Sequence, residues 1–260
     1  MTDIVKYMDI PYWKNATIDN KYQSMTRIGV IDGGYVYSDD IKENNNIKSS
    51  KNFVQKESNF YGVSMHSIHG KVVTDIITQL ARGSEIYSAK VFSDNYETTD
   101  LVIERAIDWL IKSDVKIINM SLGTYCSCHG DCELSEYIRL CREQYGIIFI
   151  VSAGNKSEEH NNDGYITCPG CASEAITVGA LNKNLMPDST INLDSSLLVG
   201  KPNLYQNGYI SYKGENFVGT SFSAPIITAM IAKRLYTKMK SFDTCQEICD
   251  YLVTNKLAYA

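Results

Sequence analysis

The chain has 260 residues and a net charge of −5 at pH 7, with 44% hydrophobic and 21% charged residues. These values are ordinary for a globular protein, and they exclude a disordered or fibrous chain. The acidic balance argues against a surface for nucleic acid or anionic lipid, which requires clustered Lys and Arg. No apolar stretch reaches the about 20 residues that a membrane helix needs. We therefore expect neither nucleic-acid nor membrane partners.

The N-terminal sequence MTDIVKYMDIPYW lacks the basic and apolar segments of a secretion signal. We therefore expect a cytoplasmic protein whose eight cysteines are mostly reduced. Residues 1–20 are interpreted as a lead-in segment of a single domain that spans residues 1–260. The sequence does not predict the oligomeric state.

Short apolar runs alternate with helical patterns along the chain. Strands are predicted at residues 27–31, 86–91, 117–120, 147–151, 175–180 and 197–199. Helices are predicted at residues 64–81, 99–112, 133–142, from 221 onward and at 244–253. The alternation indicates an α/β fold of three layers, in which helices cover both faces of a mainly parallel central sheet.

Three separate segments carry the residue types of nucleophilic catalysis. Asp32 follows the first strand, His69 lies near the start of a helix, and Ser221 lies where a glycine-containing loop opens into an apolar helix. A serine at a helix N-terminus has a free backbone N–H and the positive end of the helix dipole beside it, which suits a developing oxyanion. Taken singly, such an Asp is usually a turn residue and such a Ser an N-cap. Together they match the acid, base and nucleophile of acyl transfer.

Motifs in a fixed order resemble those of the subtilisin-like serine peptidases: RIGVIDGG, HGKVVTDII, INMSLG, IVSAGN and GTSFSAP. The resemblance extends over residues 28–232. It implies that Asp32 orients the general base His69 and that Ser221 is the nucleophile. It also implies that Asn155 donates its side-chain amide to the oxyanion, beside the Ser221 N–H.

The same resemblance implies the residues that bind substrate. Ser121, Leu122 and Gly123 would pair with the substrate backbone and form one wall of the first specificity pocket, and Ala153 and Gly154 would line the other wall. All of these residues follow predicted strands, at the sheet edge where ligands bind in parallel α/β folds.

The chain departs from the family pattern at several positions. Gly33 replaces the usual small hydroxyl residue, and Lys71 stands where Thr is usual. His66 could pair with His69 as a metal ligand, but we interpret it as a loop residue, because catalysis needs the His69 imidazole unliganded. The tight calcium loop of many relatives is missing from the sequence, so we expect no calcium cofactor.

Five cysteines lie in two segments that border the first specificity pocket in the family fold: Cys126, Cys128, Cys132, Cys168 and Cys171. Cys168 and Cys171 have C-x-x-C spacing, and two of the other three could complete a tetrahedral zinc site. The alternatives are a disulfide or redox gate, and reduced thiols that pack as small apolar side chains. Cys141, Cys245 and Cys249 lie on apolar helix faces and are predicted core residues.

The resemblance predicts a compact intracellular serine endopeptidase that cleaves peptide or protein substrates through an acyl-enzyme. The missing chaperone domain favours a dedicated processing role, such as removal of a leader from a ribosomally made peptide. The rival interpretation is a catalytically silent pseudopeptidase that binds peptides or a partner in the same groove.

Overall fold

The structure is a computed structural model that describes residues 5–7, 26–35, 46–54, 65–125, 128–156, 166–182, 184–187, 201–238 and 244–260. Its centre is a seven-stranded sheet with the strand order β3-β4-β2-β5-β6-β7-β8. In chain order, the strands are β2 (Arg27–Asp32), β3 (Ile47–Asn52), β4 (Glu85–Lys90), β5 (Ile117–Met120), β6 (Ile148–Ser152), β7 (Ala175–Leu181) and β8 (Leu204–Asn207). All neighbouring pairs are parallel.

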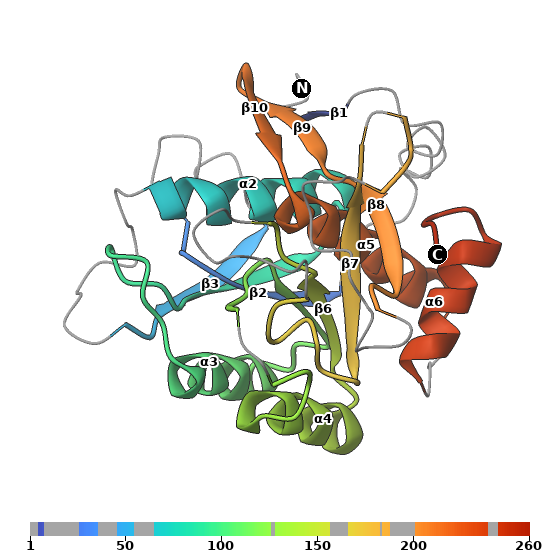
Figure 1. Cartoon of the computed structure of the whole chain (residues 1–260). Coiled ribbons are helices and arrows are strands. Elements are labelled where there is room, and N and C mark those ends of the chain that lie inside the picture. Colours follow the sequence, from blue (N-terminus) through green and yellow to red (C-terminus); the bar gives the residue numbers. More distant parts are fainter. Residues whose placement is uncertain are drawn as a thin grey trace.

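Helices cover both faces of this sheet (Figure 1). On one face, α2 (Met65–Leu80) packs against α5 (Thr220–Lys238). On the other face, α3 (Asp100–Lys112) packs against α4 (Glu133–Tyr145). The last helix, α6 (Cys245–Thr254), contacts β7. The predicted three-layer α/β fold is thereby confirmed. Within the described part of the chain, no helix combines the length and apolarity needed to cross a bilayer.

The sheet separates two apolar cores. Ile117 belongs to the core beneath α2 and α5, whereas its neighbour Ile118 belongs to the core beneath α3 and α4. Successive side chains of a strand point to opposite faces, so a strand covered on both faces is apolar along its whole length. This explains why runs such as Ile148–Val151 identify the central strands so clearly in the sequence.

A small antiparallel sheet leads into α5. It consists of β1 (Val5–Tyr7), β9 (Tyr209–Tyr212) and β10 (Glu215–Val218), in the order β1-β9-β10. The turn between β9 and β10 is Lys213-Gly214, with φ angles of 50° and 89°. Two successive positive φ angles are what a two-residue type I′ hairpin requires.

The predicted elements agree with the structure except at a few places. Helix α4 continues to Tyr145, because Gly146 ends it in the left-handed conformation with φ of 67°. The interpretation of His66 as a loop residue is wrong, since His66 lies in the first turn of α2. The strand predicted at residues 197–199 lies outside the described residues.

A buried ion pair within α2 explains the unusual Lys71. Its Nζ lies 2.6 Å from Asp75 Oδ2 and donates to the Tyr35 hydroxyl at 3.2 Å. The Asp75 carboxylate also accepts hydrogen bonds from Tyr35 (3.0 Å) and Tyr212 (2.9 Å). Only 7% and 8% of the two charged side chains are exposed. The Asp75 carboxylate lies one helical turn from Lys71 and is fully hydrogen-bonded. This counter-charge allows a buried lysine two residues from His69.

We expect Lys71→Met to lower the free energy of unfolding by about 3–5 kcal/mol, because it leaves the Asp75 carboxylate buried without its counter-charge. The double variant Lys71→Met/Asp75→Asn should recover most of this loss, since the amide oxygen still accepts from the tyrosines. Urea titration measures both. The control is Arg139→Ala, which breaks the exposed pairs with Glu136 and Glu143 on α4. A loss for Lys71→Met no larger than for this control would contradict the prediction.

Candidate active site

Asp32 and His69 come together at the carboxyl edge of the sheet. Asp32 is the last residue of β2, and α2 carries His69. The Nδ1 atom of His69 lies 2.9 Å and 3.1 Å from the two carboxylate oxygens of Asp32. An ionised carboxylate only accepts hydrogen bonds, so Nδ1 carries the proton and Nε2 is left as an acceptor. The Gly33 N–H also donates to Asp32 Oδ1, at 2.7 Å.

The environment of His69 raises its pKa above the ordinary 6.5. Burial of the imidazole disfavours the charged form, but the negative charge of Asp32 and the hydrogen bond to it together outweigh this effect. An imidazole with a raised pKa is a stronger base. It acts as a base only in its neutral form, which is reached as the pH rises through that pKa.

The glycine after His69 allows α2 to approach the loop that follows β2. A Cβ atom on Gly70 would lie 2.1 Å from the Gly34 carbonyl oxygen and 3.2 Å from Asp32 Oδ1. Any larger residue would push the helix away from the loop. The His-Gly pair in the sequence therefore reflects a steric requirement for bringing the imidazole to Asp32.

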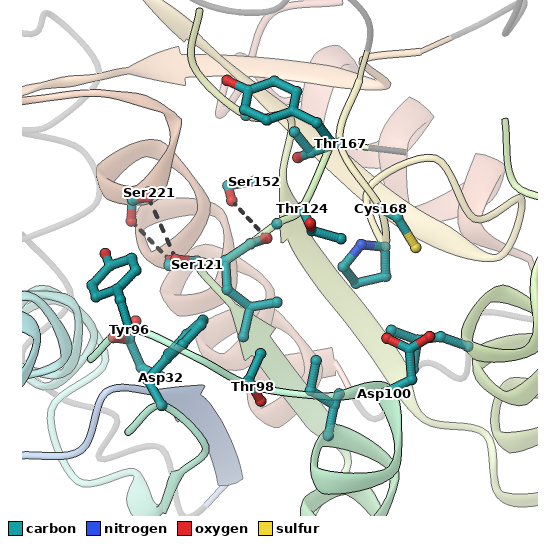
Figure 2. Close-up of a pocket in the computed structure, with 18 of the residues that line it drawn as sticks. Asp32, Tyr96, Thr98, Asp100, Ser121, Thr124, Ser152, Thr167, Cys168 and Ser221 are labelled. Carbon is teal, nitrogen blue, oxygen red and sulfur yellow. Dashed lines mark hydrogen bonds between the residues drawn. The ribbon is translucent and has the colours of Figure 1, made fainter. Parts of the chain in front are cut away.

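Ser221 lies in the first turn of α5. Its Oγ donates to the Ser121 carbonyl at 3.5 Å, which is long for an O–H···O hydrogen bond. In return, Ser121 Oγ donates to the Ser221 carbonyl at 2.8 Å. Figure 2 shows these contacts on the same side of the cavity as Asp32. The Phe222 ring lies against the His69 imidazole, with 5.5 Å between ring centroids. The residue after the nucleophile candidate thus packs against the base candidate, and Ser221 Oγ itself makes a long hydrogen bond.

A chain of buried hydrogen bonds fixes α5 against β5. Thr228 Oγ1 donates to Asn119 Oδ1 at 2.9 Å, and Asn119 Nδ2 donates to Ser121 Oγ at 3.0 Å. Ser121 then contacts Ser221, as described above. Neither Asn119 nor Thr228 was among the functional residues predicted from the sequence. The available signal was Asn119 itself, a polar side chain inside an otherwise apolar strand.

The side chain of Asn155 is oriented by the residue before Ser221. Its Oδ1 accepts hydrogen bonds from the Thr220 N–H (3.0 Å) and from Thr220 Oγ1 (3.3 Å). Thr220 Oγ1 in turn accepts from the Gly154 N–H at 3.1 Å. A Cβ on Gly219, whose φ is 142°, would crowd both polar atoms of the Asn155 amide at 3.1 Å. Because the carbonyl end of the amide is held, its Nδ2 donor has a defined direction.

These side chains line one cavity of about 440 Å³. The cavity brings together all of the candidate catalytic and substrate-binding residues but one: Asp32, His69, Asn155, Ser221, Ser121, Leu122, Gly123 and Gly154. The exception is Ala153, which is fully buried and is not part of the lining. Its carbonyl accepts hydrogen bonds from the N–H and Oγ1 of Thr167, which does line the cavity. Ala153 therefore supports the wall from behind instead of forming it.

The sequence model of the subtilase family matches residues 23–257. The chain belongs to the subtilase family. It is 24% identical over 218 residues to the thermostable alkaline protease of Halalkalibacterium halodurans, covering 79% of this chain and 55% of that protein. It is 27% identical over 217 residues to subtilisin DY of Bacillus licheniformis, covering 79% and 75%. The chain thus spans about half the length of the first relative.

Solved structures of subtilisin-like proteases share the fold. The prenylagaramide maturation protease PagA matches with a TM-score of 0.71 and 21% identity, over 94% of this chain and 88% of that one. A cold-adapted subtilisin-like serine proteinase matches with a TM-score of 0.70 and 22% identity, over 90% and 83%. The expected family and fold are confirmed.

The wall of the cavity in this subtilase is built from two closely packed loops. A Cβ on Gly123 would lie 2.2 Å from Thr167 Oγ1, so only glycine fits at this contact. Beyond it, Thr124 and Cys168 exchange two backbone hydrogen bonds of 2.9 Å. Ser152 Oγ donates to the Leu122 carbonyl at 3.3 Å, as Figure 2 shows. The chain after β5 is therefore held beside the loop that precedes β7.

The same two loops bring four of the five candidate cysteines together. The sulfur atoms of Cys128, Cys132 and Cys168 all lie within 4.8 Å of one another, and Cys171 Sγ lies 3.7 Å from Cys128 Sγ. Cys126 lies outside the described residues. The remaining predictions for cysteines are confirmed, since the other three are buried in helices as core residues: Cys141, Cys245 and Cys249.

Proposed function

We propose that this subtilase is an active serine endopeptidase with Asp32, His69 and Ser221 as its catalytic triad. The observation that carries the proposal is the 2.9 Å hydrogen bond between Asp32 and His69 Nδ1, in a cavity that also contains Ser221. The bond fixes the tautomer that leaves Nε2 as the proton acceptor.

The proposed reaction proceeds through an acyl-enzyme. Ser221 Oγ attacks the substrate carbonyl carbon while His69 Nε2 takes the hydroxyl proton, and Asp32 stabilises the imidazolium. The tetrahedral oxyanion accepts hydrogen bonds from the Ser221 N–H and from Asn155 Nδ2. His69 then gives its proton to the leaving amine, and a water molecule activated by His69 hydrolyses the ester. The bond between Asn155 Oδ1 and Thr220 supports this role, because it directs the amide donor.

We infer that the substrate binds as an added strand along residues 121–123, with its side chain in the cavity between the two loops. A dedicated processing role, such as removal of a leader from a ribosomally made peptide, is supported by the likeness to the fold of a protease named for maturation, PagA. A processing protease should make one cut in its precursor. Cleavage of an unfolded general protein such as casein into many small fragments would argue against this role.

A covalent probe distinguishes an active peptidase from a catalytically silent binding protein. After treatment with a fluorophosphonate, intact-mass analysis should show a single adduct on the wild-type chain, because an activated serine displaces the leaving group from phosphorus. Ser221→Ala should show none. Circular dichroism of both proteins serves as the folding control. A folded wild-type protein that forms no adduct would overturn the proposed activity and favour the pseudopeptidase.

A further inference from the structure

Four thiols converge from two loops on the α3–α4 side of the sheet. Cys128 and Cys132 flank the turn that precedes α4, and Cys168 and Cys171 flank the turn that precedes β7. The sulfur atoms of Cys132 and Cys168 lie 3.5 Å apart, and those of Cys128 and Cys171 lie 3.7 Å apart. Each loop thus contributes one partner to each close pair. The sulfur atoms of Cys128, Cys132 and Cys168 all lie within 4.8 Å of one another, and Cys171 joins this group through Cys128.

These distances match a metal centre better than disulfides. Zn–S bonds of about 2.3 Å in a tetrahedron place neighbouring sulfurs about 3.8 Å apart. A disulfide requires a sulfur–sulfur distance of about 2.0 Å. The sequence spacings, three residues between Cys128 and Cys132 and two between Cys168 and Cys171, are those of paired zinc ligands. The donor set also selects the metal, because four thiolates in a tetrahedron favour zinc over calcium or magnesium.

We propose that Cys128, Cys132, Cys168 and Cys171 bind one structural Zn²⁺ ion. On binding, the four thiols release their protons to solvent, and the ion with four thiolates carries a net charge of −2. No redox step is involved. Cys126 is not needed, because the described residues already provide four ligands.

Groups around the thiols are suited to thiolate ligands. Ser135 Oγ lies 3.2 Å from Cys132 Sγ, within hydrogen-bonding distance of this sulfur atom. Gly130 has φ of 91°, and a Cβ there would lie 2.6 Å from the Cys171 carbonyl oxygen. The turn between the first two ligands is therefore a glycine turn packed directly on the second pair. Such outer contacts fix the orientation of metal ligands.

The ion would be a structural support for the specificity wall. Cys168 itself lines the cavity, across from Ser221 (Figure 2), and its backbone pairs with Thr124 just beyond the predicted substrate-binding segment. Cross-linking the two loops through one metal would hold the wall at a fixed distance from the catalytic residues. All four zinc positions are filled by protein, so the ion has no site for substrate or water. The inference goes beyond the proposed function and does not depend on it.

Metal analysis of the full chain, purified with reductant and without chelators, tests the inference. We expect about one zinc per chain for the wild type and less than about a tenth for Cys132→Ser/Cys168→Ser, since a closed site needs all four ligands. The matched control is Cys249→Ser, which removes a buried thiol from α6 and should retain the zinc. Ser221→Ala should also retain it, so a failure of the proposed activity leaves this result unchanged.

If the double variant fails to fold, a second measurement on the wild-type chain tests the inference. Wild-type chain treated with chelator and titrated with Co²⁺ should develop thiolate-to-cobalt charge-transfer bands and tetrahedral d–d bands, with an end point at one equivalent. Less than about a tenth of an equivalent of zinc, together with no such bands on chain with reduced thiols, would overturn the inference. Mass analysis showing disulfides between the loops in the chain as isolated would overturn it in favour of a redox bridge.

Discussion

Replacing His69 by alanine is expected to lower kcat by about 10⁶-fold, the size of the effect measured for the corresponding loss in subtilisin. Ser221→Ala should cause a similar loss. The double variant should be no worse than either single one, because a serine without its base and a base without its serine are equally unproductive. The activity that remains would come from binding and from the oxyanion donors at Asn155 and the Ser221 backbone.

The comparison requires one peptide substrate that the wild type cleaves and turnover measured at saturating concentration. Arg139→Ala on the exposed side of α4 is the control, and its kcat should equal that of the wild type. Losses that multiply in the double variant would show that the two side chains act independently. That outcome would contradict the proposed triad.

Asp32→Asn is expected to lower kcat by about 10⁴-fold, as substitution of the triad aspartate does in other serine proteases. The substitution should also move the acidic limb of the pH profile to lower pH. In the wild type, the charge and hydrogen bond of Asp32 outweigh burial and raise the pKa of His69, so the neutral base forms only at higher pH. Without that charge, burial dominates, and the imidazole loses its proton more readily.

The measurement is the pH dependence of kcat/KM for the wild type and Asp32→Asn, because this ratio reports ionisation in the free enzyme. A matched comparison is Asp100→Asn, which removes another carboxylate of the cavity lining, at the start of α3, that does not contribute to the raised pKa of His69. Its acidic limb should stay near that of the wild type. A limb that moves equally in both variants would mean that the general charge of the cavity, and not the Asp32 contact, controls the base.

The sequence is most informative where a residue is constrained from several sides. Central strands such as β6 are buried on both faces, and Ile148–Val151 appears in the sequence as an uninterrupted apolar run. The candidates Asp32, His69 and Ser221 occur in motifs whose neighbours are fixed by close packing, as Gly70 and Gly219 show. These positions could be predicted because few other residues fit there.

Elements that depend on contacts distant in sequence were missed. Strand β3 has the sequence IKSSKN and is largely exposed, so only its pairing with β4 identifies it. The hairpin of β9 and β10 did have a local signal, because the turn pair Lys213-Gly214 follows β9, a short strand of alternating burial. The burial of the Lys71–Asp75 ion pair could not be predicted either. Tyr35 and Tyr212, which form hydrogen bonds with this pair, come from distant parts of the chain.

In this subtilase, the candidate catalytic residues and one wall of the cavity are supported by opposite faces of the central sheet. His69 and Ser221 are carried by α2 and α5, whereas the cavity wall near Cys168 rests on the layer of α3 and α4. In the proposed peptidase, substitutions in the second layer would reshape what the cavity accepts, while α2 and α5 keep the candidate catalytic residues in place. Substrate preference and reaction chemistry would then be separable traits, and each could diverge while the other is preserved.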